Sequence, residues 1–209
     1  MGQKEKFLTL TVNELLDYSE GFHPKLTLLE LQEAGLANEV QSVYRKIGGI
    51  YELFPMNYRW DIQRQDFILE LDEELHFNKY RLITLDSSLY NNYPFFSVAN
   101  YRIYCEKYEC NCLKAGSWGG KWKSQSSEKQ FLQSGPDGEL NGNGSSRWRQ
   151  RAFYDYLKDV NSLVRGIKVI RISIYDQFHG EPLKFILEAQ DKKKLKKYLS
   201  ELFEKYEIK

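Results

Sequence analysis

The sequence lacks a hydrophobic run long enough to cross a membrane, and its charges nearly cancel. A membrane-spanning helix needs about 20 consecutive apolar residues, and no stretch of the chain approaches that length. The formal net charge is +1, so the protein has no global basic field of the kind that draws many proteins to nucleic acid. We therefore expect no membrane contact, and any contact with nucleic acid must depend on a local patch.

Cysteine is also scarce, and the first residues lack the apolar core of a signal peptide. We therefore expect a cytoplasmic protein. The three cysteines, Cys105, Cys110 and Cys112, form an odd, clustered set, which argues against a disulfide framework. With a histidine they could hold Zn²⁺. Because the spacing lacks the paired Cys-x2-Cys of most zinc sites, ordinary thiols are the alternative.

Several nucleotide-binding and catalytic motifs are absent. The chain has no P-loop, no Rossmann glycine fingerprint and no Gly-x-Ser-x-Gly nucleophile elbow. These absences leave an ATPase, a dehydrogenase or an esterase without support. Hydrophobic residues make up 42% of the 209 residues, which is enough for one globular core. We therefore expect a single domain over residues 1–209.

The most informative segment is a hairpin that carries acidic residues where a buried sheet normally has none. Residues 58–62 and 67–71 have the pattern of two short strands around a polar turn. Side chains two positions apart on a strand share a face, so Glu70 and Asp72 project together, and Asp61 can reach them across the hairpin. Converging carboxylates raise one another's pKa unless a cation is present. This pattern predicts a Mg²⁺ or Mn²⁺ site at these three residues, unless the carboxylates are simply solvated.

Other segments alternate between helical and strand patterns. Apolar residues recur at helical spacing over residues 38–47 and 100–110, and Lys168–Tyr175 has the apolar character of a buried strand. We expect an α/β fold with a mixed central β-sheet flanked by helices. Its expected parts are an N-terminal helical segment (1–35), a core (36–82 and 147–176), an insertion (83–146) and a C-terminal helix (190–209), whose lysine run is typical of a solvated face.

Glycine, serine and asparagine are concentrated over residues 114–146, and this composition predicts a long loop. The loop contains tryptophans and lysines, the combination with which nucleic-acid grooves stack bases and hold phosphates. These residues are Lys114, Trp118, Lys121, Trp122 and Lys123. A loop of this length could instead become ordered on a protein partner.

A helix with a serine cap is predicted to begin at Arg147. Its basic side chains are Arg147, Arg149, Arg151 and Lys158. Asp155 shares a stripe with three of them because residues four apart are neighbours on a helix. The stripe is either a solvated face braced by a weak surface ion pair or a set of phosphate contacts.

In the order of these elements the chain resembles the restriction-endonuclease-like (PD-(D/E)XK) superfamily, and within it the very-short-patch repair endonucleases and related small uncharacterised proteins. Asp61 matches the first Asp of their pattern, Asp72 the residue after the hydrophobic strand, and His76 the histidine that follows. Glu39 is the best-placed candidate for their upstream Glu, although the helix dipole also favours a carboxylate in a first turn. Asp72 stands where most of the superfamily has Lys.

The resemblance implies a metal-dependent endonuclease that hydrolyses DNA phosphodiesters in restriction, defence or repair, with Asp61, Glu70 and Asp72 as metal ligands. It implies a restriction-endonuclease-like fold with a long Gly/Ser/Trp-rich insertion. His76 would act as general acid or base, since histidine titrates near neutral pH, or would be a structural partner of the carboxylates. The alternatives are a non-catalytic nucleic-acid-binding module on the same fold and a protein-interaction domain. DNA is the expected partner, and a homodimer is left open.

Overall fold

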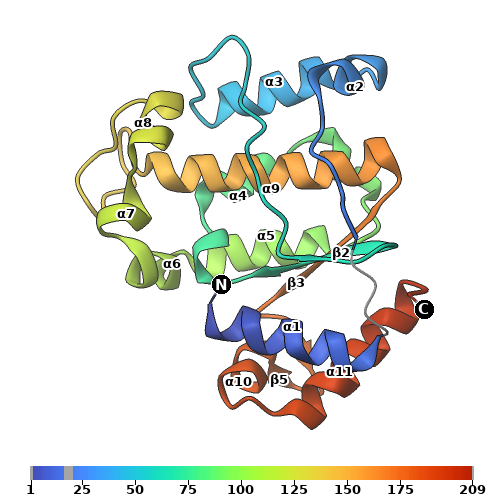
Figure 1. Ribbon diagram of the computed structural model, residues 1–209. Coiled ribbons are helices and arrows are strands. Elements are labelled where there is room, and N and C mark those ends of the chain that lie inside the picture. Colours follow the sequence, from blue (N-terminus) through green and yellow to red (C-terminus); the bar gives the residue numbers. More distant parts are fainter. Residues whose placement is uncertain (1, 17–20, 209) are drawn as a thin grey trace. The chain divides into compact units, whose positions relative to one another are not determined.

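The computed structural model describes residues 2–16 and 21–208, which form two compact units (Figure 1). Among the described residues, unit 1 consists of residues 2–16, 21–24, 59–72 and 167–208, and unit 2 of residues 25–58 and 73–166. The predicted N-terminal helical segment includes residues 17–20, which lie outside the described residues. In the described part of the chain no helix is both long and apolar enough to cross a membrane.

Unit 1 contains a small mixed sheet with the strand order β1-β2-β3. Strand β1 (Ile62–Gln63) pairs antiparallel with β2 (Phe67–Asp72), and β2 pairs parallel with β3 (Lys168–Ser173). A short hairpin, β4 (Gln177–Phe178) and β5 (Glu181–Pro182), follows. The second predicted strand of the hairpin, the predicted strand at Lys168 and the mixed α/β class are confirmed. The first strand of the hairpin was predicted over residues 58–62, but only Ile62–Gln63 form a strand.

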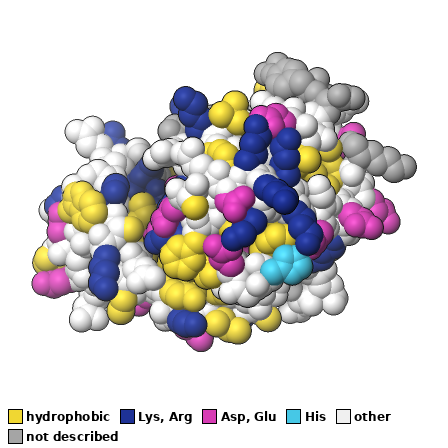
Figure 2. Space-filling model, turned by 90° about the horizontal axis from the view of Figure 1, so that it is seen from below, with side chains coloured by type: hydrophobic (Ala, Val, Ile, Leu, Met, Phe, Trp, Pro, Cys, Tyr) yellow, Lys and Arg dark blue, Asp and Glu magenta, His cyan; other side chains and the backbone are white. Residues whose placement is uncertain are grey.

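The described helices of unit 1 are α1 (Gln3–Leu15), α10 (Leu183–Glu188) and α11 (Lys192–Lys205). Helix α11 begins at the cap Asp191 and packs its apolar side on β2, where the rings of Phe67 and Phe203 lie 5.4 Å apart. The amphipathic C-terminal helix is therefore confirmed. Seen from below, Lys and Arg side chains gather in a row on one face of the molecule (Figure 2).

Unit 2 is helical. Its elements are α2 (Leu28–Glu33), α3 (Ala37–Lys46), η1 (Glu74–His76), α4 (Lys79–Thr84), η2 (Ser88–Asn92), α5 (Val98–Lys107), α6 (Glu109–Gly116), α7 (Gly119–Trp122), α8 (Gln125–Phe131) and α9 (Ser146–Arg165). Helix α9 runs through this unit and contacts α3, α4, α7, α8 and η1 (Figure 1). Ser145 caps its first turn, as predicted, and Gly166 ends it in the left-handed conformation that favours glycine.

The prediction of a long loop over residues 114–146 is wrong, because helices α7 and α8 and the end of α6 lie there. Trp122 explains the difference. Its ring is fully buried and lies 5.0 Å from that of Trp148, so hydrophobic burial orders the segment. Two of the serines that suggested a loop are helix caps, since Ser124 caps α8 and Ser145 caps α9.

The cysteines do not gather around a common point. Cys105 and Cys112 are buried, whereas Cys110 is exposed. Among the described residues these thiols form no group of three ligand atoms close enough to hold one metal ion, so the arrangement gives the predicted zinc site no support. Burial raises the pKa of the Cys112 thiol to about 12, although a hydrogen bond from Asn78 Nδ2 to the sulfur opposes that shift.

The packing of Trp122 leads to a stability prediction. We expect Trp122→Ala to lower the free energy of unfolding by about 3–5 kcal/mol, because it leaves a cavity beside Trp148. Trp118→Ala, a matched change at a half-exposed ring, should change that free energy by no more than about 1 kcal/mol. Urea unfolding followed by circular dichroism measures both, and equal losses would contradict the assignment of Trp122 to the core.

The cysteines lead to a reactivity prediction. The thiolate is the form that reacts with alkylating agents, so burial and the raised pKa of Cys112 should protect it. In native protein treated with iodoacetamide, mass spectrometry should find Cys110 modified first and Cys112 unmodified until denaturant is added. Alkylation of Cys112 at the rate of Cys110 would show that its pocket opens readily.

Candidate functional site

The structure brings two of the predicted metal ligands, Asp61 and Glu70, together across the hairpin. The Asp61 N–H donates to Glu70 Oε1 at 3.0 Å, and the Leu71 N–H donates to Asp61 Oδ2 at 3.0 Å. These two backbone-to-side-chain bonds connect the two sides of the hairpin beyond the short strand β1. Both carboxylates therefore already accept backbone hydrogen bonds.

Asp72, the third predicted ligand, has a cation supplied by the protein. Arg171 Nη1 donates to both carboxylate oxygens of Asp72, at 2.9 and 3.0 Å, and both side chains are buried. Strand alternation correctly places Glu70 and Asp72 on one face, but it does not point to Arg171. A signal was present in the sequence, since Arg171 is the one charge that interrupts the apolar run between Val169 and Ile172.

Glu39, the upstream candidate, lies in the first turn of α3 and reaches η2. Its Oε1 accepts hydrogen bonds from the Ser87 hydroxyl at 2.7 Å and from the Ser88 N–H at 3.3 Å. The Ser87 hydroxyl also lies 3.1 Å from that of Tyr156, whose pKa burial raises. These bonds connect α3, η2 and α9 and give Glu39 a structural role.

The expected nucleic-acid contacts of the insertion divide into exposed and buried groups. Trp118 and Lys121 are exposed and adjacent, with Lys121 Nζ 4.6 Å from the centre of the Trp118 ring. Lys114 is exposed as well, and Lys123 is exposed and pairs with Asp137. Trp122 is in the core, and its indole N–H donates to the Gly135 carbonyl, so the prediction that it stacks on bases is wrong.

The basic residues of α9 also differ in their burial and contacts. Lys158 is buried because other helices surround α9, so its predicted contact with phosphate is wrong. Arg149 donates to the carbonyls of Ile47 and Asn143 and stacks on Tyr80. Arg147 is half-buried and donates to Gln150. The remaining member, Arg151, lines a pocket.

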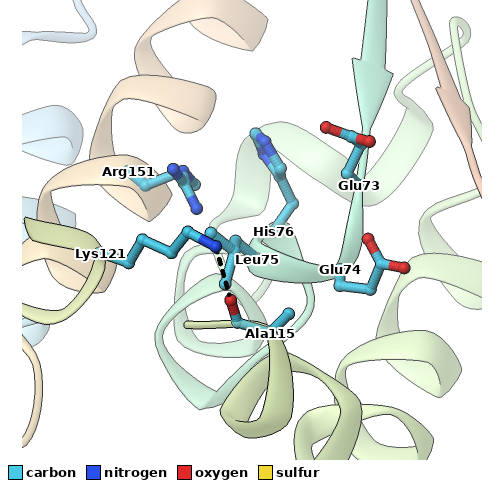
Figure 3. Close-up of a pocket in the computed structure, with 7 residues that line it drawn as sticks. All are labelled: Glu73, Glu74, Leu75, His76, Ala115, Lys121 and Arg151. Atoms are coloured by element: carbon cyan, nitrogen blue, oxygen red, sulfur yellow. Dashed lines mark hydrogen bonds between the residues drawn. The ribbon is translucent and has the colours of Figure 1, made fainter. Parts of the chain in front are cut away.

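This pocket lies within unit 2 and has a volume of about 310 Å³. It is lined by Glu73, Glu74, Leu75, His76, Ala115, Lys121 and Arg151. Figure 3 shows the basic side chains of Lys121 and Arg151 on one side, the two glutamates on the other, and His76 between them. Acidic and basic groups from η1, the α7 segment and α9 thus surround one space, a mixture that can hold both a cation and a phosphate.

His76, the predicted acid or base, is held by a carboxylate. Its Nδ1 lies 2.7 Å from Asp155 Oδ2, and Asp155 is buried while His76 lines the pocket. A carboxylate at Nδ1 fixes the orientation of the ring and the position of its proton. The helical spacing places Asp155 on the same stripe as Arg151, but it does not predict the contact with His76. No spacing rule predicts a contact between residues 79 apart.

The pocket contains carboxylates, the ligand type that hard divalent cations prefer. Mg²⁺ keeps several waters and is commonly held by one or two carboxylates together with substrate phosphates. Glu73 and Glu74 offer such carboxylates, with Lys121 and Arg151 placed for the phosphate. The hairpin carboxylates accept hydrogen bonds from backbone amides or from Arg171.

The pair of Asp72 and Arg171 leads to a stability prediction. Asp72→Asn should lower the free energy of unfolding by about 3–5 kcal/mol, because it leaves a buried guanidinium without a countercharge. Asp86→Asn breaks an exposed pair with Arg102 and should cost less than about 1 kcal/mol. Chemical denaturation compares the two, and Asp72→Leu/Arg171→Met should recover much of the lost stability. Equal costs at Asp72 and Asp86 would rule out a structural role for the buried pair.

Comparison with known proteins places the chain in a family. Residues 42–189 match the model of a family of unknown function, DUF7255. Neither the curated proteins nor the solved structures contain a match to the chain. The matched residues include all those that line the pocket, and they make up more than half of the chain. The protein therefore belongs to this family of unknown function, DUF7255.

Proposed function

We propose that the protein is a metal-dependent endonuclease that hydrolyses DNA phosphodiesters in the pocket of unit 2. The observation that carries the proposal is the contact of His76 with Asp155 beside Glu73, Glu74, Lys121 and Arg151. A histidine oriented by a carboxylate is a common general acid or base. A pocket that also offers carboxylates and cations suits phosphate chemistry more than acyl transfer, for which no nucleophile motif is present.

Each side chain has a role in this proposal. Water attacks phosphorus, a new P–O bond forms, and the bond to the leaving oxygen breaks. His76 Nε2 takes the proton of the attacking water, and the charge of Asp155 stabilises the resulting imidazolium. Lys121 and Arg151 neutralise the phosphate oxygens. Mg²⁺ or Mn²⁺ held at Glu73 and Glu74 would polarise the phosphate and lower the pKa of the water.

DNA as the substrate and a restriction-endonuclease-like fold are parts of the same proposal. The order of an antiparallel hairpin and a parallel strand reached through helices supports the fold. The ring of Trp118 beside Lys121 supports a nucleic acid, since aromatic rings stack on bases. A cytoplasmic location, expected from the sequence, would suit this activity.

The test is cleavage of supercoiled plasmid and of short mismatched duplexes with Mg²⁺ or Mn²⁺. His76→Asn should lower the cleavage rate by about 10²–10⁴-fold, the usual contribution of a general acid or base, and it should remove a limb of the pH–rate profile. His179→Asn is the matched control, because His179 is exposed and also contacts a carboxylate, that of Glu201. It should leave cleavage unchanged.

The outcomes separate the roles of His76. If more metal restores the activity of His76→Asn, the imidazole is a metal ligand and not an acid or base. If both histidine variants cut as fast as wild type, the pocket is not the active site.

A non-catalytic nucleic-acid-binding module is the second candidate. The observation in its favour is that Asp61, Glu70 and Asp72, the ligands implied by the resemblance, already have hydrogen-bond or ion-pair partners in the protein. Retention of DNA without cleavage under any metal would favour this alternative.

A further inference from the structure

Most charges along α11 lie in the reverse of the order that stabilises a helix. Five lysines occupy the first half, at positions 192, 193, 194, 196 and 197, whereas Glu201 and Glu204 lie in the second half, which contains one lysine, Lys205. A helix carries partial positive charge at its N-terminus and partial negative charge at its C-terminus. Both groups therefore lie at the unfavourable end, and helix formation does not explain their placement.

Neighbouring carboxylates neutralise part of this lysine cluster. Glu14 on α1 lies 2.6 Å from Lys192 Nζ and 3.0 Å from Lys196 Nζ. Glu181 lies 2.7 Å from Lys194 Nζ, and that contact raises the pKa of Lys194, which keeps it charged. The Glu14 carboxylate thus pairs with two lysines, and the cluster keeps an excess of positive charge.

Two lysines of the cluster, Lys193 and Lys197, are exposed and have no ion pair among the described residues. They are four positions apart, so they are neighbours on one face, where like charges repel. Neither lysine is among the buried residues of α11, which include Leu195, Leu199 and Phe203. The two exposed charges therefore contribute to neither the core nor the helix.

We propose that the lysine face of α11, centred on Lys193 and Lys197, binds the phosphate backbone of duplex DNA. Charge complementarity is the argument, since a row of ammonium groups without carboxylate partners suits a row of phosphates. Lysine is a compact point charge without the planar fork with which arginine reads bases. The contact would hold the backbone without reading its sequence.

An anionic membrane is the rival occupant, and α11 is poorly suited to it. A helix that lies in a membrane surface inserts an apolar face between the lipids. The apolar side of α11 is used in unit 1, where Phe203 packs on Phe67 and Leu195 is fully buried. The face of α11 left for a partner is therefore a charged one, with Lys193 and Lys197 exposed.

The test is binding of a fluorescent 20-base-pair duplex, measured by anisotropy in EDTA between about 50 and 200 mM salt. EDTA removes the metal, so the result does not depend on whether the protein cleaves DNA. Lys193→Gln/Lys197→Gln should weaken binding several-fold at the lower salt concentration. The slope of log K against log salt should become shallower by about 2, roughly one for each lost phosphate contact.

The matched control is Lys46→Gln/Lys129→Gln, which removes the same number of charges from exposed residues of unit 2. It should leave the salt slope at the wild-type value. Equal slopes for the two double variants would overturn the proposal, because the binding would then reflect charge in general. Vesicles with phosphatidylserine provide a second probe. Loss of vesicle binding with unchanged DNA binding would assign the face to a membrane and also overturn the proposal.

Discussion

The buried ion pair of Asp72 and Arg171 is the constraint on which the sheet of unit 1 depends. Both charges are removed from water inside adjacent parallel strands, and an isolated buried charge is too costly to keep. The pair is tolerable because one Arg171 nitrogen bonds to both oxygens of Asp72. This requirement sets the register of β2 against β3, since a shift by one residue would move one partner to the other face.

In unit 2 a buried charge likewise has a partner of opposite charge. Arg81 and Asp159 form a fully buried pair at 2.7 Å, and the hydroxyl of Tyr90 donates to the same Asp159 oxygen at 2.6 Å. Asp155 lies one helical turn earlier on α9 and contacts His76. Helix α9 thus presents two carboxylates to cationic or titratable partners on α4 and η1. The contact with Arg81 is buried, whereas the contact with His76 lies beside the pocket.

Capping residues and hydrophobic patterns predicted many helices and strands, but they did not predict the tertiary contacts between them. The serine cap of α9, the apolar strand β3 and the amphipathic helix α11 follow from properties of neighbouring residues. The insertion was misjudged because its composition resembles that of a loop, whereas the burial of Trp122 against Trp148 orders it. His76 could be selected as a candidate from its place after the acidic strand, but its partner Asp155 could not, because the two residues meet only in the folded chain.

The mixed α/β class, the acidic hairpin with Glu70 and Asp72 on one face, and the dense lysine cluster of α11 follow from the sequence, since strand alternation and charge order depend on neighbouring residues. Which charges meet depends on the folded chain. The tertiary structure gave Asp72 an arginine of the neighbouring strand, buried Lys158, and placed Glu73, His76, Lys121 and Arg151 around one pocket. The physical reason is that ion pairing and burial act over a few ångströms between residues far apart in the chain.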